Sequence, residues 1–149
     1  MNTSKKELTQ FLCEAKKNTY AVAQNEVNGT RPDSHDFLYE NESLKYIDTY
    51  LGSEQFIGEE AVWENNKPIW GLNYTGRALS SDFDIDFLKE ALKRSTEEYP
   101  YRGPKFFMKG NFTYKCRVEG DFGWFVGCEK IMYKGTKVYE AMFQGGFIK

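Results

Sequence analysis

The chain has 149 residues, a net charge of −2 and an aromatic content of 17 %, which is enough for one domain with a hydrophobic core. No basic run marks a site for nucleic acid, so direct nucleic-acid binding is not expected. No apolar stretch approaches the roughly 20 residues of a membrane-spanning helix, and the N-terminal sequence lacks the apolar core of a signal peptide. We therefore expect a cytoplasmic protein without membrane contact.

Two helices are predicted, over residues 4–17 and 84–97, because apolar residues recur there on one helical face. The residues predicted to cap them are Ser4 with Glu7 for the first helix and Asp82 or Asp84 for the second. The long polar segment 18–43, which lies between the first helix and the first strand, is predicted to be a loop that is functional or mobile.

Six strands are predicted from apolar runs separated by turn residues. They span residues 44–51, 56–64, 68–75, 112–119, 123–133 and 137–144. The short connections between them predict antiparallel pairing. Large apolar residues occupy both alternating positions of 56–64, so both faces of the sheet are expected to be partly covered.

An internal repeat is predicted, because "FLCEAKK" at 11–17 and "FLKEALK" at 87–93 are identical at five of seven positions. Collinear matches follow, including Glu60 with Glu129. The repeat units are about 4–79 and 82–149, within a single domain 1–149. We therefore expect an α+β fold, in which a duplicated helix-plus-three-strand unit forms a mainly antiparallel six-stranded curved sheet or partial barrel against two helices.

Cys13, Cys116 and Cys128 are odd in number and widely spaced, which argues against disulfides and predicts buried free thiols. His35 is the only histidine, so a zinc site is not expected. No metal, cofactor or catalytic residue is assigned. His35 lies between a serine and an aspartate, where it either holds a turn or acts as a general base.

Arginine is the first indication of a ligand. The sequence has 15 Lys and five Arg, and Arg31, Arg77 and Arg102 occur in turn-like contexts. Arginine binds carboxylate or phosphate through a bidentate fork that lysine cannot reproduce. These arginines therefore either pair with glutamates and attach loops to the sheet, or bind an anionic ligand whose ring stacks on Trp or Tyr.

The segment 56–77 supplies further candidates. Alternation places Glu59 and Glu60 on opposite faces, which excludes a catalytic pair. Glu60 has a counterpart in the second repeat unit, whereas Glu59, Trp63 and Arg77 have none, so these three are better candidates for function. Trp124 in "EGDFGWFVG" either packs beside a tight strand connection or forms a pocket wall. The candidate ligand-binding residues are Arg31, His35, Glu59, Trp63, Trp70, Tyr74, Arg77, Arg102 and Trp124.

The phrases "YIDTYLG", "FIGEEAVW", "KPIWGLNYTGR", "FLKEAL" and "PYRGP" resemble a bacterial family of uncharacterised domains, found alone or behind XRE-type helix-turn-helix regulators. The resemblance covers nearly the whole chain and implies an effector-sensing module, without supplying catalytic residues. Only one convincing helix precedes the first predicted strand, so there is no room for a helix-turn-helix.

The leading hypothesis is a non-catalytic domain that senses or sequesters a small molecule. Its ligand is predicted to be anionic, partly planar and nucleotide-like, bound between the repeat units or between one sheet face and the segment 18–43. One alternative is a hydrolase or isomerase that uses Glu60, Asp121 or His35. Another is a protein–protein adaptor with an exposed aromatic surface. A twofold homodimer is also compatible with the sequence.

Overall fold

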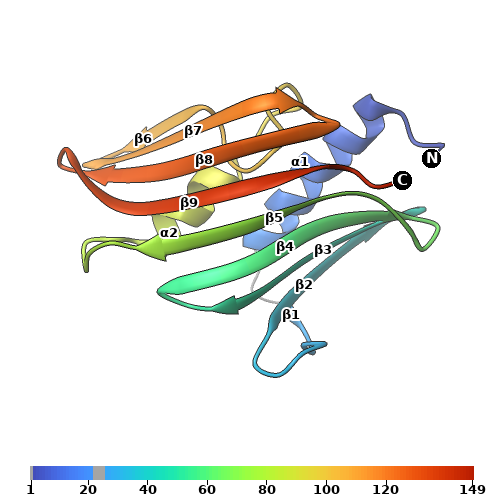
Figure 1. The fold of residues 1–149 in the computed structure, drawn as a ribbon, viewed down its shortest axis with the longest axis horizontal. Helices are drawn as coiled ribbons and strands as arrows, with labels where there is room; N and C mark the ends of the chain where they lie inside the picture. Colours follow the sequence, from blue (N-terminus) through green and yellow to red (C-terminus); the bar gives the residue numbers. More distant parts are fainter. Residues whose placement is uncertain (1, 22–25) are drawn as a thin grey trace.

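The computed structural model describes residues 2–21 and 26–149. Its described residues form two helices and nine strands (Figure 1). The helices are α1 (Lys5–Ala21) and α2 (Ile85–Leu92). The strands are β1 (Glu26–Val27), β2 (His35–Asn41), β3 (Leu44–Gly52), β4 (Gln55–Glu64), β5 (Lys67–Ala78), β6 (Phe106–Lys109), β7 (Phe112–Asp121), β8 (Trp124–Tyr133) and β9 (Thr136–Phe147).

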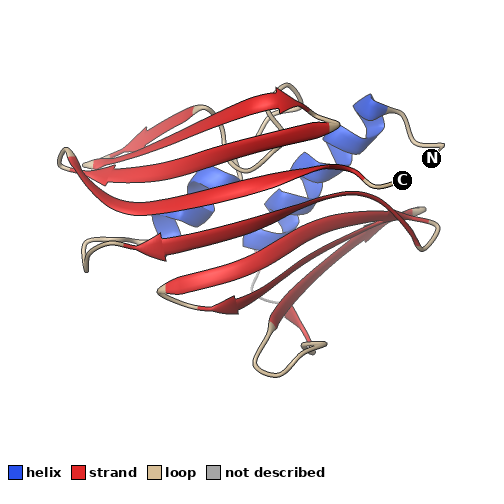
Figure 2. Cartoon of the chain, viewed as in Figure 1, coloured by secondary structure: helices blue, strands red, loops and turns tan. Residues whose placement is uncertain are grey.

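All nine described strands belong to one antiparallel sheet, in the order β1-β2-β3-β4-β5-β9-β8-β7-β6. Consecutive hairpins build each half of this sheet, and the pairing of β5 with β9 joins the two halves. Both helices lie on the same side of the sheet, behind it in the view of Figure 2. The opposite side, which we call the helix-free face, carries neither of them.

The predicted six-stranded sheet or partial barrel is wrong. All six predicted strands are present, but β1, β2 and β6 extend the sheet at its two ends. The sheet is open, because its terminal strands β1 and β6 are not neighbours. The sequence predicts a loop over 18–43, but residues 18–21 belong to α1 and residues 35–41 form β2, while residues 22–25 lie outside the described residues. Asp36 is buried within β2, where Thr30 and Thr49 donate hydrogen bonds to its carboxylate.

The predicted helix starts are confirmed. At α1, the Ser4 backbone N–H donates to Glu7 Oε2 at 2.7 Å, and the Glu7 N–H donates to Ser4 Oγ at 3.2 Å. This is the reciprocal capping box. At α2, Asp84 accepts a hydrogen bond from the Asp86 N–H. The helix ends at Leu92, five positions before the predicted end at 97, because the chain then turns toward Pro100.

The hydrophobic core lies between the sheet and the helices. Tyr46, Val62 and Trp70 are fully buried there, together with the apolar face of α1. Both faces of 56–64 are expected to be partly covered, and on the helix-free face of this strand Ala61 is buried whereas Ile57 is exposed. On the helix-free face, the exposed fraction is 82 % for Trp124 and 70 % for Met142.

Three further expectations concern the two sheet halves, the thiols and membranes. Gly58 lies under the ring of Tyr74, and Gly127 lies under the ring of Phe143 at the aligned position; the duplication itself stays a prediction.

All three cysteines are free, but Cys128 is exposed rather than buried. Within the described ranges, neither helix combines the length and the apolar character needed to cross a membrane.

Candidate functional site

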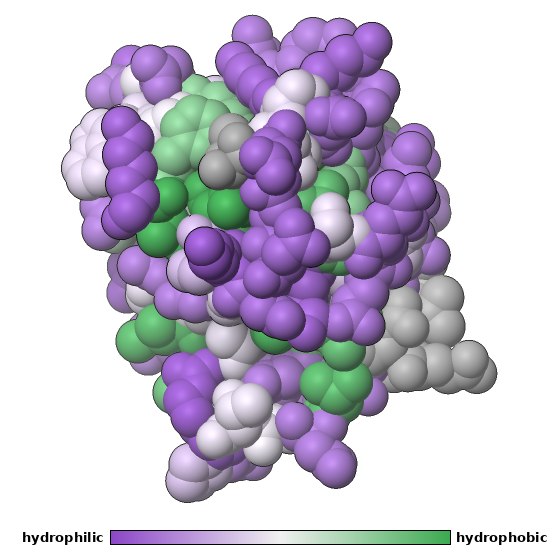
Figure 3. Space-filling model, turned by 90° about the vertical axis from the view of Figure 1, so that its right-hand side faces the viewer, coloured by the Kyte–Doolittle hydropathy of each residue, from purple (hydrophilic) through white to green (hydrophobic). Residues whose placement is uncertain are grey.

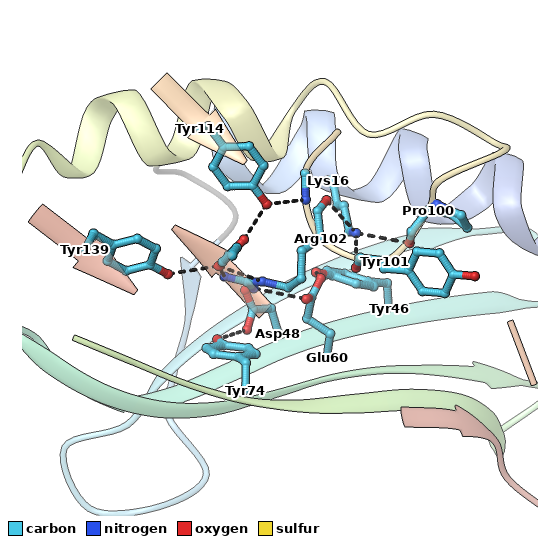
Figure 4. Close-up of polar contacts among 12 residues, drawn as sticks. Lys16, Tyr46, Asp48, Glu60, Tyr74, Pro100, Tyr101, Arg102, Tyr114 and Tyr139 are labelled. Carbon is cyan, nitrogen blue, oxygen red and sulfur yellow. Dashed lines mark hydrogen bonds and ion pairs between the residues drawn. The ribbon is translucent and has the colours of Figure 1, made fainter. Parts of the chain in front are cut away.

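A cluster of buried polar side chains lies between the sheet and the helices (Figure 4). We call it the Arg102 cluster. Its members are Lys16, Tyr46, Asp48, Glu60, Tyr74, Arg102, Tyr114, Glu129 and Tyr139. Each side chain is at most 4 % exposed. Burying charges at this depth is costly unless they are paired and hydrogen-bonded.

Arg102 binds two carboxylates, one from each half of the sheet. Its Nη1 donates to Glu60 Oε2 at 3.2 Å, and its Nη2 donates to Glu129 Oε1 at 2.8 Å. Its Nε also donates to Glu129 Oε1, at 3.2 Å. The guanidinium carbon lies 4.4 Å from the ring centre of Tyr74, which adds a cation–π contact.

Tyrosine hydroxyls satisfy the remaining oxygens of the carboxylates. The Tyr46 hydroxyl donates to Glu60 at 2.5 Å, and the Tyr114 hydroxyl donates to Glu129. Tyr139 also donates to Glu129, at 2.9 Å. Burial is the main cause that raises the pKa of Tyr114 and Tyr139 well above the ordinary value, and the Glu129 charge adds to it. These hydroxyls therefore remain protonated donors.

Lys16 extends the cluster to the loop that follows α2. Its Nζ donates to the carbonyl oxygens of Pro100, Tyr101 and Arg102 at 3.2, 2.6 and 3.1 Å. Burial lowers the pKa of Lys16, while the Glu60 charge acts in the opposite direction. In Figure 4, Lys16 descends from α1 to these carbonyls, opposite Glu60 on β4. The amine thereby fixes the backbone that carries Arg102.

The buried polar side-chain atoms of the Arg102 cluster already have hydrogen-bond partners within the protein. Among the described residues, no buried side-chain nitrogen or oxygen lacks a hydrogen-bond partner. The guanidinium of Arg102 faces internal carboxylates rather than solvent. The structural alternative for Arg102, a glutamate pair that attaches a loop to the sheet, is therefore the arrangement observed.

A different feature, on the helix-free face, has the shape of a binding site. It is a hollow of about 650 Å³, centred on the junction of β5 and β9, and we call it the central hollow. This volume is within the range of roughly 300–1,000 Å³ that small-molecule sites occupy. Its polar lining residues are Glu59, Asn73, Glu119 and Gln144. Its aromatic lining residues are Trp124, Phe125 and Phe147, and Val126 lies among them.

The strand register explains this composition. One cross-strand row contains Thr49, Glu59, Asn73, Gln144, Val126 and Glu119, in the order β3, β4, β5, β9, β8 and β7. The neighbouring row contains Ala61, Gly71, Gly146 and Trp124. Glycine and alanine carry little or no side chain, so this second row forms a low floor beside the large Trp124 ring.

A second hollow, of about 510 Å³, lies on the sheet, and Ile57 and Met142 are among its lining residues. Its charged lining residues are Arg77 and Glu140. Arg77 donates to Glu140 Oε1 through Nε at 3.0 Å and through Nη2 at 2.7 Å. Its guanidinium is therefore already paired, although 54 % of the side chain is exposed.

The structure brings Glu59 and Trp124 together in the central hollow, from opposite halves of the sheet. The other predicted site residues lie elsewhere. Trp70 is fully buried and donates from Nε1 to the Phe122 carbonyl at 3.1 Å. Tyr74 belongs to the Arg102 cluster, and Trp63 is half-buried near the β4–β5 turn.

Two predicted residues lie near the β1–β2 end of the sheet. The Arg31 Nη2 donates to the Thr49 hydroxyl at 2.5 Å. His35 Nδ1 lies 2.8 Å from Glu26 Oε1, and its ring stacks on Tyr50 with a centroid separation of 4.9 Å. Both side chains thus brace local structure in this part of the sheet.

The residues of the enzyme hypothesis do not form one site. Glu60 lies in the Arg102 cluster, His35 begins β2, and Asp121 ends β7, where its carboxylate accepts the Gly123 N–H at 2.7 Å. No group of three or more His, Cys, Asp or Glu within the described ranges could hold a metal ion.

Sequence reasoning missed Asn73, Val126, Gln144 and the glycine floor. Each resembles an ordinary strand residue, and they meet only because β5 pairs with β9 across the two halves. The available signal was the run "QGG" at 144–146, since two glycines within a strand often mark a close backbone approach. At Gly146, an added Cβ would lie 2.0 Å from the Gly123 carbonyl oxygen.

The fold and the central hollow define the class of this protein: an open antiparallel sheet with two helices on one face and a glycine-floored hollow on the other. The chain belongs to the family described as a domain of unknown function, DUF5680, whose model matches residues 48–148. That match contains every strand that lines the central hollow, whereas α1 precedes it. Comparison with curated proteins and with solved structures gave no match.

Proposed function

We propose that this domain binds a small molecule with a flat apolar centre in the central hollow, and that it does so without catalysis. The observation that carries the proposal is the Trp124 side chain, which is 82 % exposed beside a floor of Gly71 and Gly146. Tryptophan is usually well buried, and a large ring left in water beside a hollow is typical of a stacking surface.

The amides of the hollow suit such a ligand. Asn73 and Gln144 are cross-strand neighbours on the helix-free face, and both are exposed. Each side chain offers one carbonyl acceptor and one donor group. They would orient a planar ligand through its polar edge, while its flat face contacts Trp124 and Val126.

The charges that line the central hollow argue against the nucleotide-like anion predicted from the sequence. A nucleotide-like anion needs basic groups. Among the described residues that line the central hollow, two are glutamates and none is lysine or arginine. Arg102 is used inside the fold, and Arg77 is paired with Glu140 in the second hollow. We therefore do not assign a phosphate group to the ligand of the central hollow.

A sensing role follows from the family resemblance. The resemblance implies domains of this kind behind XRE-type regulators, where they would couple ligand binding to a neighbouring DNA-binding unit. In this chain the same binding would signal to a separate partner or sequester the ligand. Three free cysteines fit a reducing cytoplasm, which we propose as its location.

The alternative of a protein–protein adaptor requires an exposed apolar surface, and the described residues at the end of the molecule that carries both chain termini do not present a large one (Figure 3). Figure 3 shows this end, where hydrophobic residues form small separate areas among hydrophilic ones. A docking surface for a protein would present a larger continuous apolar patch.

Tryptophan fluorescence tests the proposal, because the three tryptophans differ in exposure. A broad panel of planar compounds should contain ligands that change the emission of the exposed Trp124. Trp124→Phe should abolish that change, and the matched control Trp63→Phe should retain it. A panel that leaves the emission of Trp124 unaltered would overturn the proposed function, provided that the protein is folded by circular dichroism.

A further inference from the structure

We propose that the ligand of the central hollow is an elongated dication, with a flat centre and a positive group at each end. This inference rests on the proposed function and adds the charge pattern of the ligand. It follows from the places that Glu59 and Glu119 occupy within one cross-strand row.

The two glutamates lie at opposite ends of the hollow. Glu59 is on β4 and Glu119 is on β7, with β5, β9 and β8 between them. Neighbouring strands are about 4.8 Å apart, so roughly 19 Å separates the two backbones. Both side chains are exposed. A single compact cation cannot contact both carboxylates, whereas an elongated one can.

Glu59 is available for such a contact. It makes no hydrogen bond or ion pair with the described residues, although it lines the hollow. Glu119 receives a hydrogen bond from Arg117 at 2.9 Å, and the two side chains are 67 % and 79 % exposed. An ion pair this exposed is weak and exchanges readily with a ligand cation.

Among the described residues that line the hollow between the two glutamates, none is positively charged, which suits a neutral centre. Asn73, Gln144 and Val126 continue the row, and the floor beside them is glycine and alanine. Trp124 borders this floor, and an indole face attracts both flat rings and cationic groups. A ligand with charges only at its ends therefore matches the charge pattern of the hollow from β4 to β7.

Three matched probes test the inference: biphenyl with an amidinium group at each end, biphenyl with one amidinium, and biphenyl with a carboxylate at each end. Their affinities are measured by fluorescence titration of Trp124 near neutral pH and at low salt, since salt screens exposed charges. The bisamidine should bind about tenfold more tightly than the monoamidine, which corresponds to one additional ionic contact. The dicarboxylate should bind more weakly than either.

Charge-neutral variants identify the contacts. Glu59→Gln and Glu119→Gln should each reduce the affinity of the bisamidine to about that of the monoamidine. The matched control is Glu54→Gln, which removes an exposed carboxylate outside the hollow and should change the affinity less than about twofold.

Equal binding of the bisamidine and the monoamidine, unchanged affinity in both glutamine variants, or tighter binding of the dicarboxylate would each refute the dication. So would the absence of bisamidine binding when another planar compound binds at Trp124. In all these cases the proposed function survives, because a ligand still occupies the hollow. The proposed function fails separately, when no compound of the broad panel alters Trp124.

Discussion

Glu60 and Glu129 bind the same guanidinium, although they lie on different halves of the sheet. Arg102 reaches Glu60 at 3.2 Å and Glu129 at 2.8 Å, and all three side chains are buried. The residue that joins the halves comes from the loop between them, whose backbone is fixed by Lys16 of α1. The cluster thus links α1, the loop that follows α2 and both halves of the sheet.

Replacing Arg102 should therefore destabilise the whole domain. Arg102→Ala leaves two carboxylates buried without their cation, which costs about 3–5 kcal/mol of unfolding free energy in comparable pairs. Urea unfolding followed by circular dichroism measures this cost. The control is Arg117→Ala, which removes an exposed arginine and should have a far smaller effect. Similar losses in the two variants would contradict the assigned role of Arg102.

Replacing Lys16 tests whether its contact with the loop stabilises the domain, and Lys17 on the same helix provides the comparison. Lys16→Met removes an amine that donates to three carbonyls and leaves them buried, at an expected cost of about 3 kcal/mol. Lys17→Met is the matched control, because Lys17 is exposed on the same helix. The comparison uses urea midpoints at constant m-value. If the Lys17 variant were as unstable as the Lys16 variant, the loss of stability would come from helix propensity and not from the loop contact.

Ionisation of the buried Cys116 thiol should make the stability of the protein depend on pH. Burial, with the Glu129 charge as the next cause, raises the pKa of Cys116 from 9.0 to about 12. The unfolded thiol therefore loses its proton at lower pH than the folded one. The stability contributed by Cys116 is fully present below pH 9.0 and is lost as the pH rises toward about 12.

This effect is isolated by comparing the wild-type protein with Cys116→Ala. The difference in their unfolding free energies should decrease steadily as the pH rises above 9.0. Cys128→Ala, which removes an exposed thiol, is the control for loss of a cysteine. An unchanged or increasing difference would show that the Cys116 thiol does not titrate as the fold implies.

The regular parts of the fold were predictable, because local patterns determine them. Helix periodicity and the Ser4–Glu7 capping box located α1, and alternation placed Glu59 and Glu60 on opposite faces. The strands at the ends of the sheet were not predictable in this way. β2 buries Asp36, whose polarity suggests a loop until its partners Thr30 and Thr49 are known.

The candidate site could be predicted only in part, because its residues come from strands far apart in the chain. Glu59 and Trp124 were identified from the sequence, whereas Asn73 and Gln144 depend on the pairing of β5 with β9. For Arg102, the sequence predicted the type of group it binds but not the location of that group. The sequence marked it as a residue suited to bind carboxylate, and the carboxylates it binds belong to the protein itself.

The floor of the central hollow provides a test that leaves all charges in place. A Cβ added to Gly71 would lie 3.1 Å from the Glu60 carbonyl oxygen and 3.3 Å from the Ala61 Cβ. Gly71→Ala should therefore fold with a small adjustment, and the methyl group should raise the floor beneath the ligand. We expect about tenfold weaker binding of any planar ligand with little change in the urea midpoint. Unaltered affinity would place the ligand away from this floor.

Backbone amide chemical-shift mapping by NMR tests the central claim most directly. A planar ligand found by the fluorescence panel is titrated into labelled protein, and the shifted amides are located on the fold. Our account predicts that they cluster around the hollow, at Glu59 and Asn73 in one half of the sheet and at Trp124 and Gln144 in the other. Shifts confined to α1, α2 and the loop around Arg102, with the helix-free face unchanged, would contradict it.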